Sequence, residues 1–237
     1  MLLPWRGLFE QAMLADAFIF HDNILLPRSH GKGKSFQTRV QIKTEGGWEW
    51  LSLPVDRGGS MIIKEARFVN QDWRRAHLSQ IRKAYRNAPY FDHIFDDLLL
   101  GIYQYQTDFV GEFCVKGMLD VFSYLGLEVT VQYTSDLPIP EESASSRRVL
   151  EHCLYTGVDK YISGHGAMNY IDYELFERHG VKIYYMDYSL KPYPQLHGEF
   201  NPYVSIIDLL FNVGPDFRKY LGSEARYWRE MVAIEGV

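Results

Sequence analysis

The sequence predicts an α/β protein with a mostly parallel sheet, helices on both faces and an antiparallel hairpin extension. In the C-terminal half, short apolar runs typical of buried strands alternate with amphipathic stretches, which is the pattern of a helix-covered parallel sheet. Two segments of alternating polarity flank Glu45, Gly46 and Gly47, which predicts a hairpin with a short turn. The length of 237 residues favours a single domain over residues 1–237.

Apolar residues at helical spacing predict the helices, and Pro or Gly marks several of their ends. Pro89 ends one helix, and Gly126 follows another as a C-terminal stop. The expected helices cover residues 5–15, 71–86, 91–103, 107–125, 145–156, 172–178, 202–211 and 215–221.

Compact apolar runs predict the strands. The expected strands cover residues 17–20, 62–66, 127–133, 160–162 and 181–185, with 37–43 and 48–54 as the hairpin. The chain opens directly on a Pro4-Trp5 turn and a helix, whereas an α/β domain usually feeds such a turn from a first, central strand. We therefore expect a first strand to be missing from this chain.

Composition excludes several classes of protein. With 46% hydrophobic and 23% charged residues, the chain is neither mainly disordered nor mainly membrane-embedded. It has no apolar run of bilayer length and no secretory signal, so we expect a cytoplasmic protein without membrane insertion. A net charge of −5 argues against nucleic acid as the primary partner. Cys114 and Cys153 lack zinc-ligand spacing, so no metal site is predicted.

The segment 27–44 carries five cations and no acidic residue. The cations are Arg28, Lys32, Lys34, Arg39 and Lys43, and Gly31 and Gly33 lie among them. Such a segment suits the diphosphate of a nucleotide-linked sugar, because arginine gives bidentate contacts and lysine a point charge. A solvated surface loop is an equally good interpretation, since the segment lacks the spacing of a P-loop or a GxGxxG motif.

Two glycines bracket a histidine directly after the strand expected at 160–162. Open parallel sheets bind ligands at the carboxyl ends of their strands, so this loop is expected to face a cleft. His165 is the candidate general base. The other candidate contacts here are Ser163, Gly164, Gly166, Asn169 and Tyr170. The alternative is a tight turn with an exposed histidine.

A second candidate loop is rich in proline and precedes the helix that holds Asp208. Tyr193 and Gln195 in the loop, with Asp208 and Asn212 in the helix, could bind sugar hydroxyls, or they could satisfy nearby backbone groups. Tyr85 and Asp22 are further candidates, for substrate contact and for acid–base work. We expect these loops to meet in one pocket with Trp5 and its turn, because pockets gather where several element ends converge.

Several stretches resemble the WbqC-like family of bacterial surface-polysaccharide gene clusters, in family order and over nearly the whole chain. They are residues 3–9 (LPWRGLF), 15–20 (ADAFIF), 39–43 (RVQIK), 50–55 (WLSLPV), 84–91 (AYRNAPYF), 163–166 (SGHG) with Asn169 and Tyr170, 193–195 (YPQ) and 205–214 (SIIDLLFNVG). Two departures stand out. The His-Gln-Pro triplet that usually precedes the Pro-Trp turn is absent, and the family's Asp-Asp is His21-Asp22 here.

The resemblance implies a step on an activated sugar in surface-polysaccharide biosynthesis, and it brings no assigned catalytic residue. The HxGH signature of adenylating enzymes is missing. Our hypothesis is a transferase that adds a small acyl or aminoacyl group to a nucleotide-linked sugar, with His165 as base. Its partners would be that sugar and an acyl or aminoacyl donor, and no cofactor is identified. The alternative is a non-catalytic sugar-nucleotide-binding or assembly protein of a polysaccharide-synthesis complex.

Overall fold

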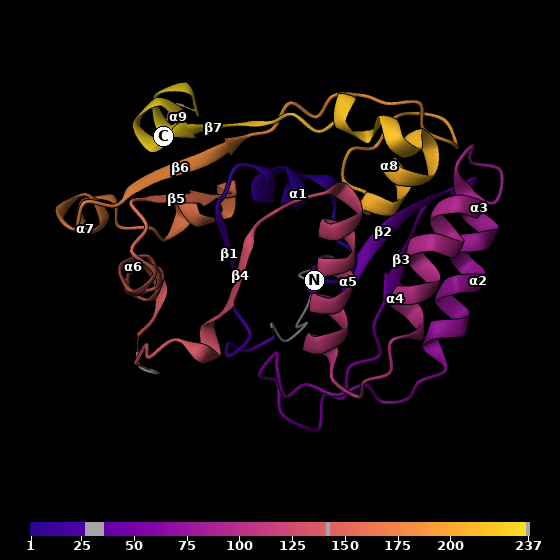
Figure 1. Ribbon diagram of the computed structural model, residues 1–237, viewed down its shortest axis with the longest axis horizontal. Helices are drawn as coiled ribbons and strands as arrows, with labels where there is room; N and C mark the ends of the chain where they lie inside the picture. The colour runs from indigo at the N-terminus through magenta and orange to yellow at the C-terminus, as the bar shows by residue number, and fades with distance from the viewer. Residues whose placement is uncertain (27–35, 141–142, 236–237) are drawn as a thin grey trace. The chain divides into compact units, whose positions relative to one another are not determined.

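The computed structural model of the protein describes residues 1–26, 36–140 and 143–235 (Figure 1). The chain is α/β, as the sequence predicts, and it divides into two compact units. Unit 1 comprises Met1–Phe9, Asp22–Glu128 and Leu190–Leu221, and unit 2 comprises Glu10–His21, Val129–Ser189 and Gly222–Val237. The single-domain interpretation stays a prediction, because two such units can make up one domain or two.

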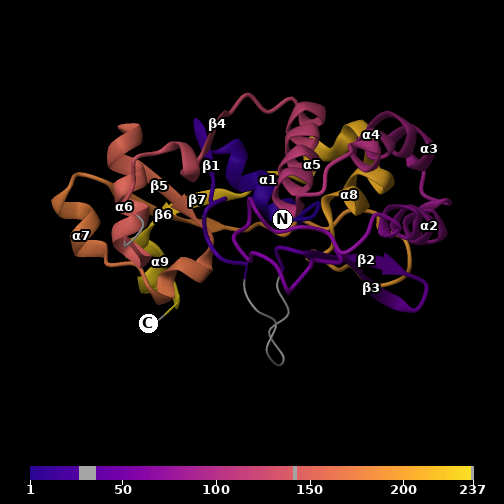
Figure 2. The ribbon, with the colours of Figure 1, turned by 90° about the horizontal axis from the view of Figure 1, so that it is seen from below.

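Unit 1 contains the predicted hairpin. Strands β2 (Arg39–Thr44) and β3 (Gly47–Ser52) pair antiparallel, with Gln41 opposite Trp50. Gly47, the first residue of β3 after the turn, has a φ of 116°, a conformation that glycine adopts without steric cost. Helix α2 (Trp73–Tyr85) lies beside the hairpin (Figure 2).

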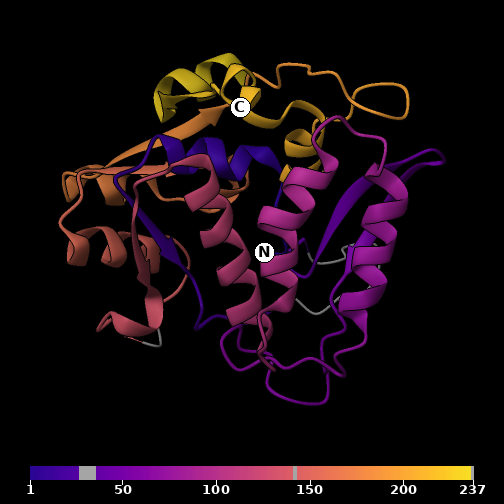
Figure 3. The ribbon, with the colours of Figure 1, turned by 45° about the vertical axis from the view of Figure 1, so that its right-hand side comes forward.

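The remaining helices of unit 1 pack around an aromatic core. α2, the α3–α4 segment and α5 stand side by side (Figure 3). The helix expected at 91–103 is α3 (Phe91–Ile94), a π-helical turn (Phe95–Leu99) and α4 (Leu100–Gln104) in succession. α5 (Val110–Leu125) ends at Gly126, whose φ of 65° makes the expected left-handed stop. α8 (Ile206–Val213) is followed by a 3-10 helix (Gly214–Lys219).

Unit 2 contains the parallel strand pairs. β1 (Ala17–Phe20) pairs with β4 (Thr130–Tyr133). β5 (Lys160–Ser163) pairs with β6 (Lys182–Asp187), and β7 (Glu224–Tyr227) adds to β6 in antiparallel orientation. Its helices are α6 (Ser145–Thr156), α7 (Tyr173–Arg178) and α9 (Trp228–Glu235), which share one buried cluster with β6. Helix α1 (Arg6–Met13) contains the boundary between the two units, after Phe9.

Three expectations about the strands need correction. The described strands form three small sheets rather than one. Some of their strand pairs are parallel and others are antiparallel, so the expected dominance of parallel pairing is only partly shown. Residues 62–66 form no strand, because Ile62 makes a single bridge with Leu25 before the chain turns. β7 and α9 were not predicted; β7 has only four residues, too short an alternation to stand out from a loop.

Candidate functional site

Unit 2 places the predicted base at the carboxyl end of a parallel strand. β5 ends at Ser163, and a 3-10 helix (His165–Asn169) follows. The exposed His165 ring has its Nε2 2.6 Å from the main-chain oxygen of Met186, at the end of β6. A carbonyl oxygen only accepts, so Nε2 carries the proton and the neutral ring has its lone pair on Nδ1. Nδ1 is therefore the basic nitrogen.

A phenol that sequence reasoning missed lies beside this histidine. The ring of Tyr188 is 5.7 Å from that of His165. Burial, and then the charge of Glu10, raises the pKa of Tyr188 to about 12, so its hydroxyl stays a proton donor at neutral pH. Tyr188 follows the end of β6, and the rule that ligands bind at carboxyl ends could have found it.

A buried carboxylate supports this edge of unit 2. Glu10 is 1% exposed, and its carboxylate accepts from the Ser223 hydroxyl at 2.6 Å. Ser223 in turn accepts from the main-chain N–H of Ser189, the residue after Tyr188. Glu10 thus holds the segment that carries Tyr188, although neither Glu10 nor Ser223 belongs to a recognisable motif.

The two glycines that flank His165 differ in their surroundings. A Cβ on Gly164 would lie 3.3 Å from the Tyr188 hydroxyl, whereas a Cβ on Gly166 would meet nothing within 4 Å. Of the other predicted contacts, Ser163 is buried, and Asn169 and Tyr170 are exposed. Of the two glycines, therefore, only Gly164 has a neighbour that would contact a larger side chain.

Unit 1 brings most of the other candidates into one buried network around Asp208. Asp208 is fully buried, and its carboxylate accepts from the hydroxyls of Tyr85 and Tyr193, each at 2.7 Å, and from Gln195 Nε2 at 2.8 Å. Burial raises the pKa of Asp208, and these hydrogen bonds oppose the rise. Asn212, one turn later in α8, donates to the Asp208 main-chain oxygen at 2.7 Å.

Lys43 extends the network into the proline-rich loop. Its ammonium donates to Gln195 Oε1 at 2.9 Å and to the main-chain oxygens of Gly198 and Glu199. Its main-chain N–H donates to the Tyr85 hydroxyl at 2.9 Å. Burial lowers the pKa of this lysine. The six predicted contacts Lys43, Tyr85, Tyr193, Gln195, Asp208 and Asn212 therefore hydrogen-bond to one another and to nearby backbone groups, and their contact with a substrate stays a prediction.

Trp5 has a packing role that explains the Pro-Trp-x-Gly sequence. A Cβ on Gly7 would lie 2.4 Å from the Trp5 ring, so only glycine fits beneath the indole. Trp5 bridges Ser205, and its ring lies 5.7 Å from that of Tyr203. The half-buried indole still has an accessible part, so its substrate contact stays a prediction.

The remaining candidates are spread along the chain. Arg28 and Lys32 lie outside the described residues. Arg39 stacks on Trp50. Asp22 comes shortly after the end of β1, at the point where the chain returns to unit 1. Since His165 belongs to unit 2, whereas Trp5 and Gln195 belong to unit 1, the single common pocket stays a prediction.

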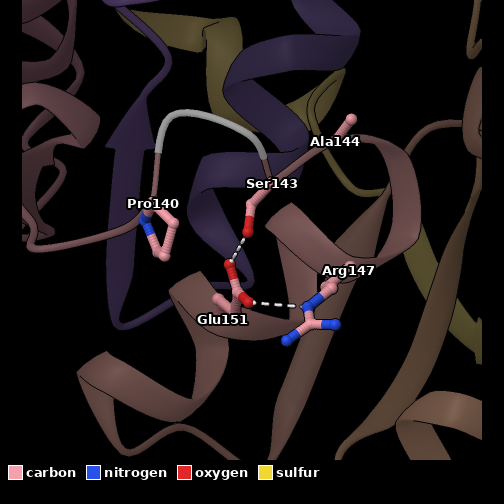
Figure 4. Close-up of a pocket in the computed structure, with 5 residues that line it drawn as sticks. All are labelled: Pro140, Ser143, Ala144, Arg147 and Glu151. Atoms are coloured by element: carbon pink, nitrogen blue, oxygen red, sulfur yellow. Dashed lines mark hydrogen bonds and ion pairs between the residues drawn. The ribbon is translucent and has the colours of Figure 1, made fainter.

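A surface hollow of about 440 Å³ lies at the start of α6 in unit 2 (Figure 4). Glu151 accepts from the Ser143 hydroxyl and from Arg147 Nε at 3.0 Å across it. Its lining is Pro140, Ser143, Ala144, Arg147 and Glu151, none of which the sequence marks as a candidate. Because the Glu151 carboxylate already accepts hydrogen bonds from Ser143 and Arg147, this hollow is a weaker candidate for a reactive site than the His165 edge.

Two searches of residues 1–26, 36–140 and 143–235 bear on the class of protein. No group of three or more His, Cys, Asp or Glu side chains in these residues is arranged to hold a metal ion. None of their helices combines the length and apolar character that crossing a bilayer needs. Cys114 and Cys153 are both buried, with the pKa of each thiol raised by burial.

Comparison with known proteins decides the family. The model of the WbqC-like protein family matches residues 1–220. The chain belongs to the WbqC-like protein family. A WbqC-like relative, the uncharacterized protein Rv1507c of Mycobacterium tuberculosis, is 30% identical over 225 residues, covering 92% of this chain and 94% of the relative. No solved structure matches the chain. Membership of the WbqC-like family suggests a role in polysaccharide-related biosynthesis.

Proposed function

We propose that this protein is a transferase that adds a small acyl or aminoacyl group to a nucleotide-linked amino sugar. The observation that carries the proposal is the hydrogen bond from His165 Nε2 to the Met186 oxygen. It fixes the tautomer of an exposed imidazole at the carboxyl end of a parallel strand, as a general base requires.

The reaction follows from the two groups at this edge. His165 Nδ1 takes a proton from the sugar amine or hydroxyl as that group attacks the carbonyl carbon of an activated acyl donor. The bond from that carbon to the donor's leaving group then breaks, the electron pair departs with that group, and the proton on His165 passes to it. The Tyr188 hydroxyl, protonated at neutral pH, donates a hydrogen bond to the oxyanion that forms in between.

The buried network of unit 1 orders a loop of the same unit. Lys43 and Gln195 hold the loop that contains Gly198 and Glu199 in one conformation. A preorganised loop binds a ligand with less loss of conformational entropy than a loose one.

The test is a transfer assay read by mass spectrometry. Purified protein is mixed with a panel of nucleotide-linked amino sugars and with acyl and aminoacyl thioester or adenylate donors. We expect His165→Ala to lower the transfer rate roughly 10²–10⁴-fold, because that is the usual contribution of a general base. His179→Ala is the matched control, since His179 is an exposed histidine of the same unit that also bonds a main-chain oxygen. Equal rates for wild type and His165→Ala would remove His165 from this role.

The second candidate function is a binding or assembly protein without chemistry of its own. The self-satisfied network around Asp208 favours it, because six predicted contacts are already engaged with one another. Thermal shift against nucleotide-linked sugars, followed by the transfer assay, distinguishes the two. Binding without turnover for every donor supports the assembly role; turnover that depends on His165 supports the transferase.

A further inference from the structure

Two consecutive residues of α1, Glu10 and Gln11, reach the two strand ends that form the His165 edge of unit 2. Side chains of consecutive helix residues point about 100° apart, so such a pair can hold two separate segments. Gln11 Nε2 donates to the main-chain oxygen of Ile162 at 2.7 Å, one residue before β5 ends. β5 leads through Gly164 into the 3-10 helix that begins at His165. Gln11 therefore anchors the strand end that precedes the candidate base.

Glu10 holds the second strand end through a relay of hydrogen bonds. Its buried carboxylate accepts from the Ser223 hydroxyl at 2.6 Å and from the main-chain N–H of Gly222 at 3.4 Å. The Ser223 oxygen accepts from the main-chain N–H of Ser189 at 3.2 Å. Ser189 directly follows Tyr188, the donor that we propose for the oxyanion. The relay therefore fixes the backbone next to that tyrosine.

The Glu10 carboxylate also acts on the Tyr188 hydroxyl itself. Burial, and then the charge of Glu10, raises the pKa of Tyr188 to about 12, so the phenol keeps its proton. The neighbouring acid Asp187 is paired with Arg226 Nε at 2.6 Å. The hydroxyl also lies close to the backbone at the end of β5, since a Cβ on Gly164 would be only 3.3 Å from it. A backbone relay, a charge and a close neighbour thus act together on one hydroxyl.

We infer that Glu10 is a positioning residue, which through Ser223 and Ser189 sets the Tyr188 hydroxyl at a fixed place relative to His165. The inference rests on the proposed function and goes beyond it, because it gives a catalytic effect to a residue that touches no substrate. An oxyanion donor acts from about 2.7–3.1 Å. A displacement of about 1 Å at a reacting centre can lower the rate roughly 10²-fold. Glu10 therefore controls kcat and leaves KM unchanged.

A double-mutant cycle on the transfer reaction tests this role, because it asks whether Glu10 acts through Tyr188. We expect Tyr188→Phe to lower kcat roughly 10²–10³-fold, the usual contribution of one oxyanion donor. Glu10→Gln should lower kcat roughly 10- to 100-fold at unchanged KM. The double variant should have the kcat of Tyr188→Phe alone, because the hydroxyl that Glu10 positions is gone. A residue with only a structural role would instead lower kcat by the same factor in both backgrounds.

Glu177→Gln is the matched control. Glu177 is another carboxylate of unit 2 with several donors, and these donors all lie in β7 or α9: Tyr227, Trp228 and Arg229. This variant should lose stability in urea denaturation and keep the kcat of wild type. If Glu10→Gln does not fold, Ser223→Ala removes only the relay hydroxyl and should give the same coupling with Tyr188→Phe.

The outcomes separate this inference from the proposed function. Equal kcat in wild type and Glu10→Gln, or an undiminished effect of Glu10→Gln in the Tyr188→Phe background, overturns the positioning role and leaves the transferase proposal standing. Equal kcat in wild type and Tyr188→Phe also overturns it, since Glu10 would then have no donor to position. If wild type transfers no group from any donor, the proposed function fails, and the catalytic role of Glu10 fails with it.

Discussion

The Asp208 network and the His165 edge both gather polar side chains that the sequence marks, yet they differ in what those side chains face. Around Asp208 every donor meets an acceptor within the protein, and the group is buried. At the carboxyl end of β5 the imidazole is exposed, and a main-chain oxygen fixes which nitrogen is basic. A closed network stabilises a fold, whereas an oriented and exposed base can act on a ligand.

The largest effect on stability is expected from opening the closed network. Asp208→Ala leaves two buried hydroxyls and the Gln195 amide without their acceptor, and we expect a loss of roughly 3–5 kcal/mol in the free energy of unfolding. Urea denaturation measures it. Asp216→Ala, at an exposed ion pair with Lys219, should cost less than about 1 kcal/mol. A loss for Asp208→Ala as small as that of the control would mean that the network contributes little.

Acid should destabilise both units through one buried histidine each. Burial lowers the pKa of His77 and of His152 to about 4, from 6.5. Below pH 6.5 the unfolded chain takes up these protons and the folded chain does not, so stability is lost as the pH falls from 6.5 to about 4. The loss is on the order of 3 kcal/mol per histidine.

Urea midpoints measured across this pH range check the expectation. His77→Gln and His152→Gln should each flatten the acid limb of the stability curve, because glutamine does not titrate there. An unchanged acid limb in both variants would contradict the assignment.

A larger side chain in the Trp5 turn should lower the free energy of unfolding by less than Asp208→Ala does. Gly7→Ala places a methyl group 2.4 Å from the Trp5 ring, so the indole must move, at a cost of roughly 1–3 kcal/mol. Gly101→Ala, in α4 with nothing within 4 Å, should instead be neutral or stabilise by up to about 1 kcal/mol. Thermal unfolding of the two variants gives the comparison; equal melting temperatures would refute the packing role.

The smallest effect is expected where the two glycines around His165 differ. Gly164→Ala would push the Tyr188 hydroxyl by a few tenths of an ångström and should lower transfer roughly tenfold, since small misplacements at a reacting centre are costly. Gly166→Ala meets open space and should leave the rate unchanged. A larger loss of transfer rate in Gly166→Ala than in Gly164→Ala would contradict the expectation that only Gly164 contacts Tyr188.

Local patterns predicted local structure well. β1 was expected at the residues where it lies, the hairpin was expected within two residues of its ends, and Gly126 ends α5 as expected. These features depend on periodicity and on the conformational freedom of glycine, both of which a short window contains.

Contacts between distant residues could not be predicted in the same way. Tyr85 meets Asp208 across 123 residues, and Ser223 meets Glu10 across 213, so no local pattern records either contact. The sequence did mark Tyr85, Tyr193, Gln195 and Asp208 as candidate substrate contacts. It could not show that they would satisfy one another, because the same residue types serve ligands and backbone equally well.

The parallel pairing of β1 with β4 limits how early unit 2 can fold while the chain is being synthesised. Ala17 pairs with Thr130, so the ribosome adds more than a hundred residues after β1 before its partner exists. At 5–20 residues per second, β1 waits on the order of 5–20 s with its hydrogen-bonding edge unpaired. An unpaired strand edge can pair with another chain, so the growing chain is prone to aggregate during that interval. Unit 2 can complete its fold only after the ribosome has added its segment from Gly222 onwards.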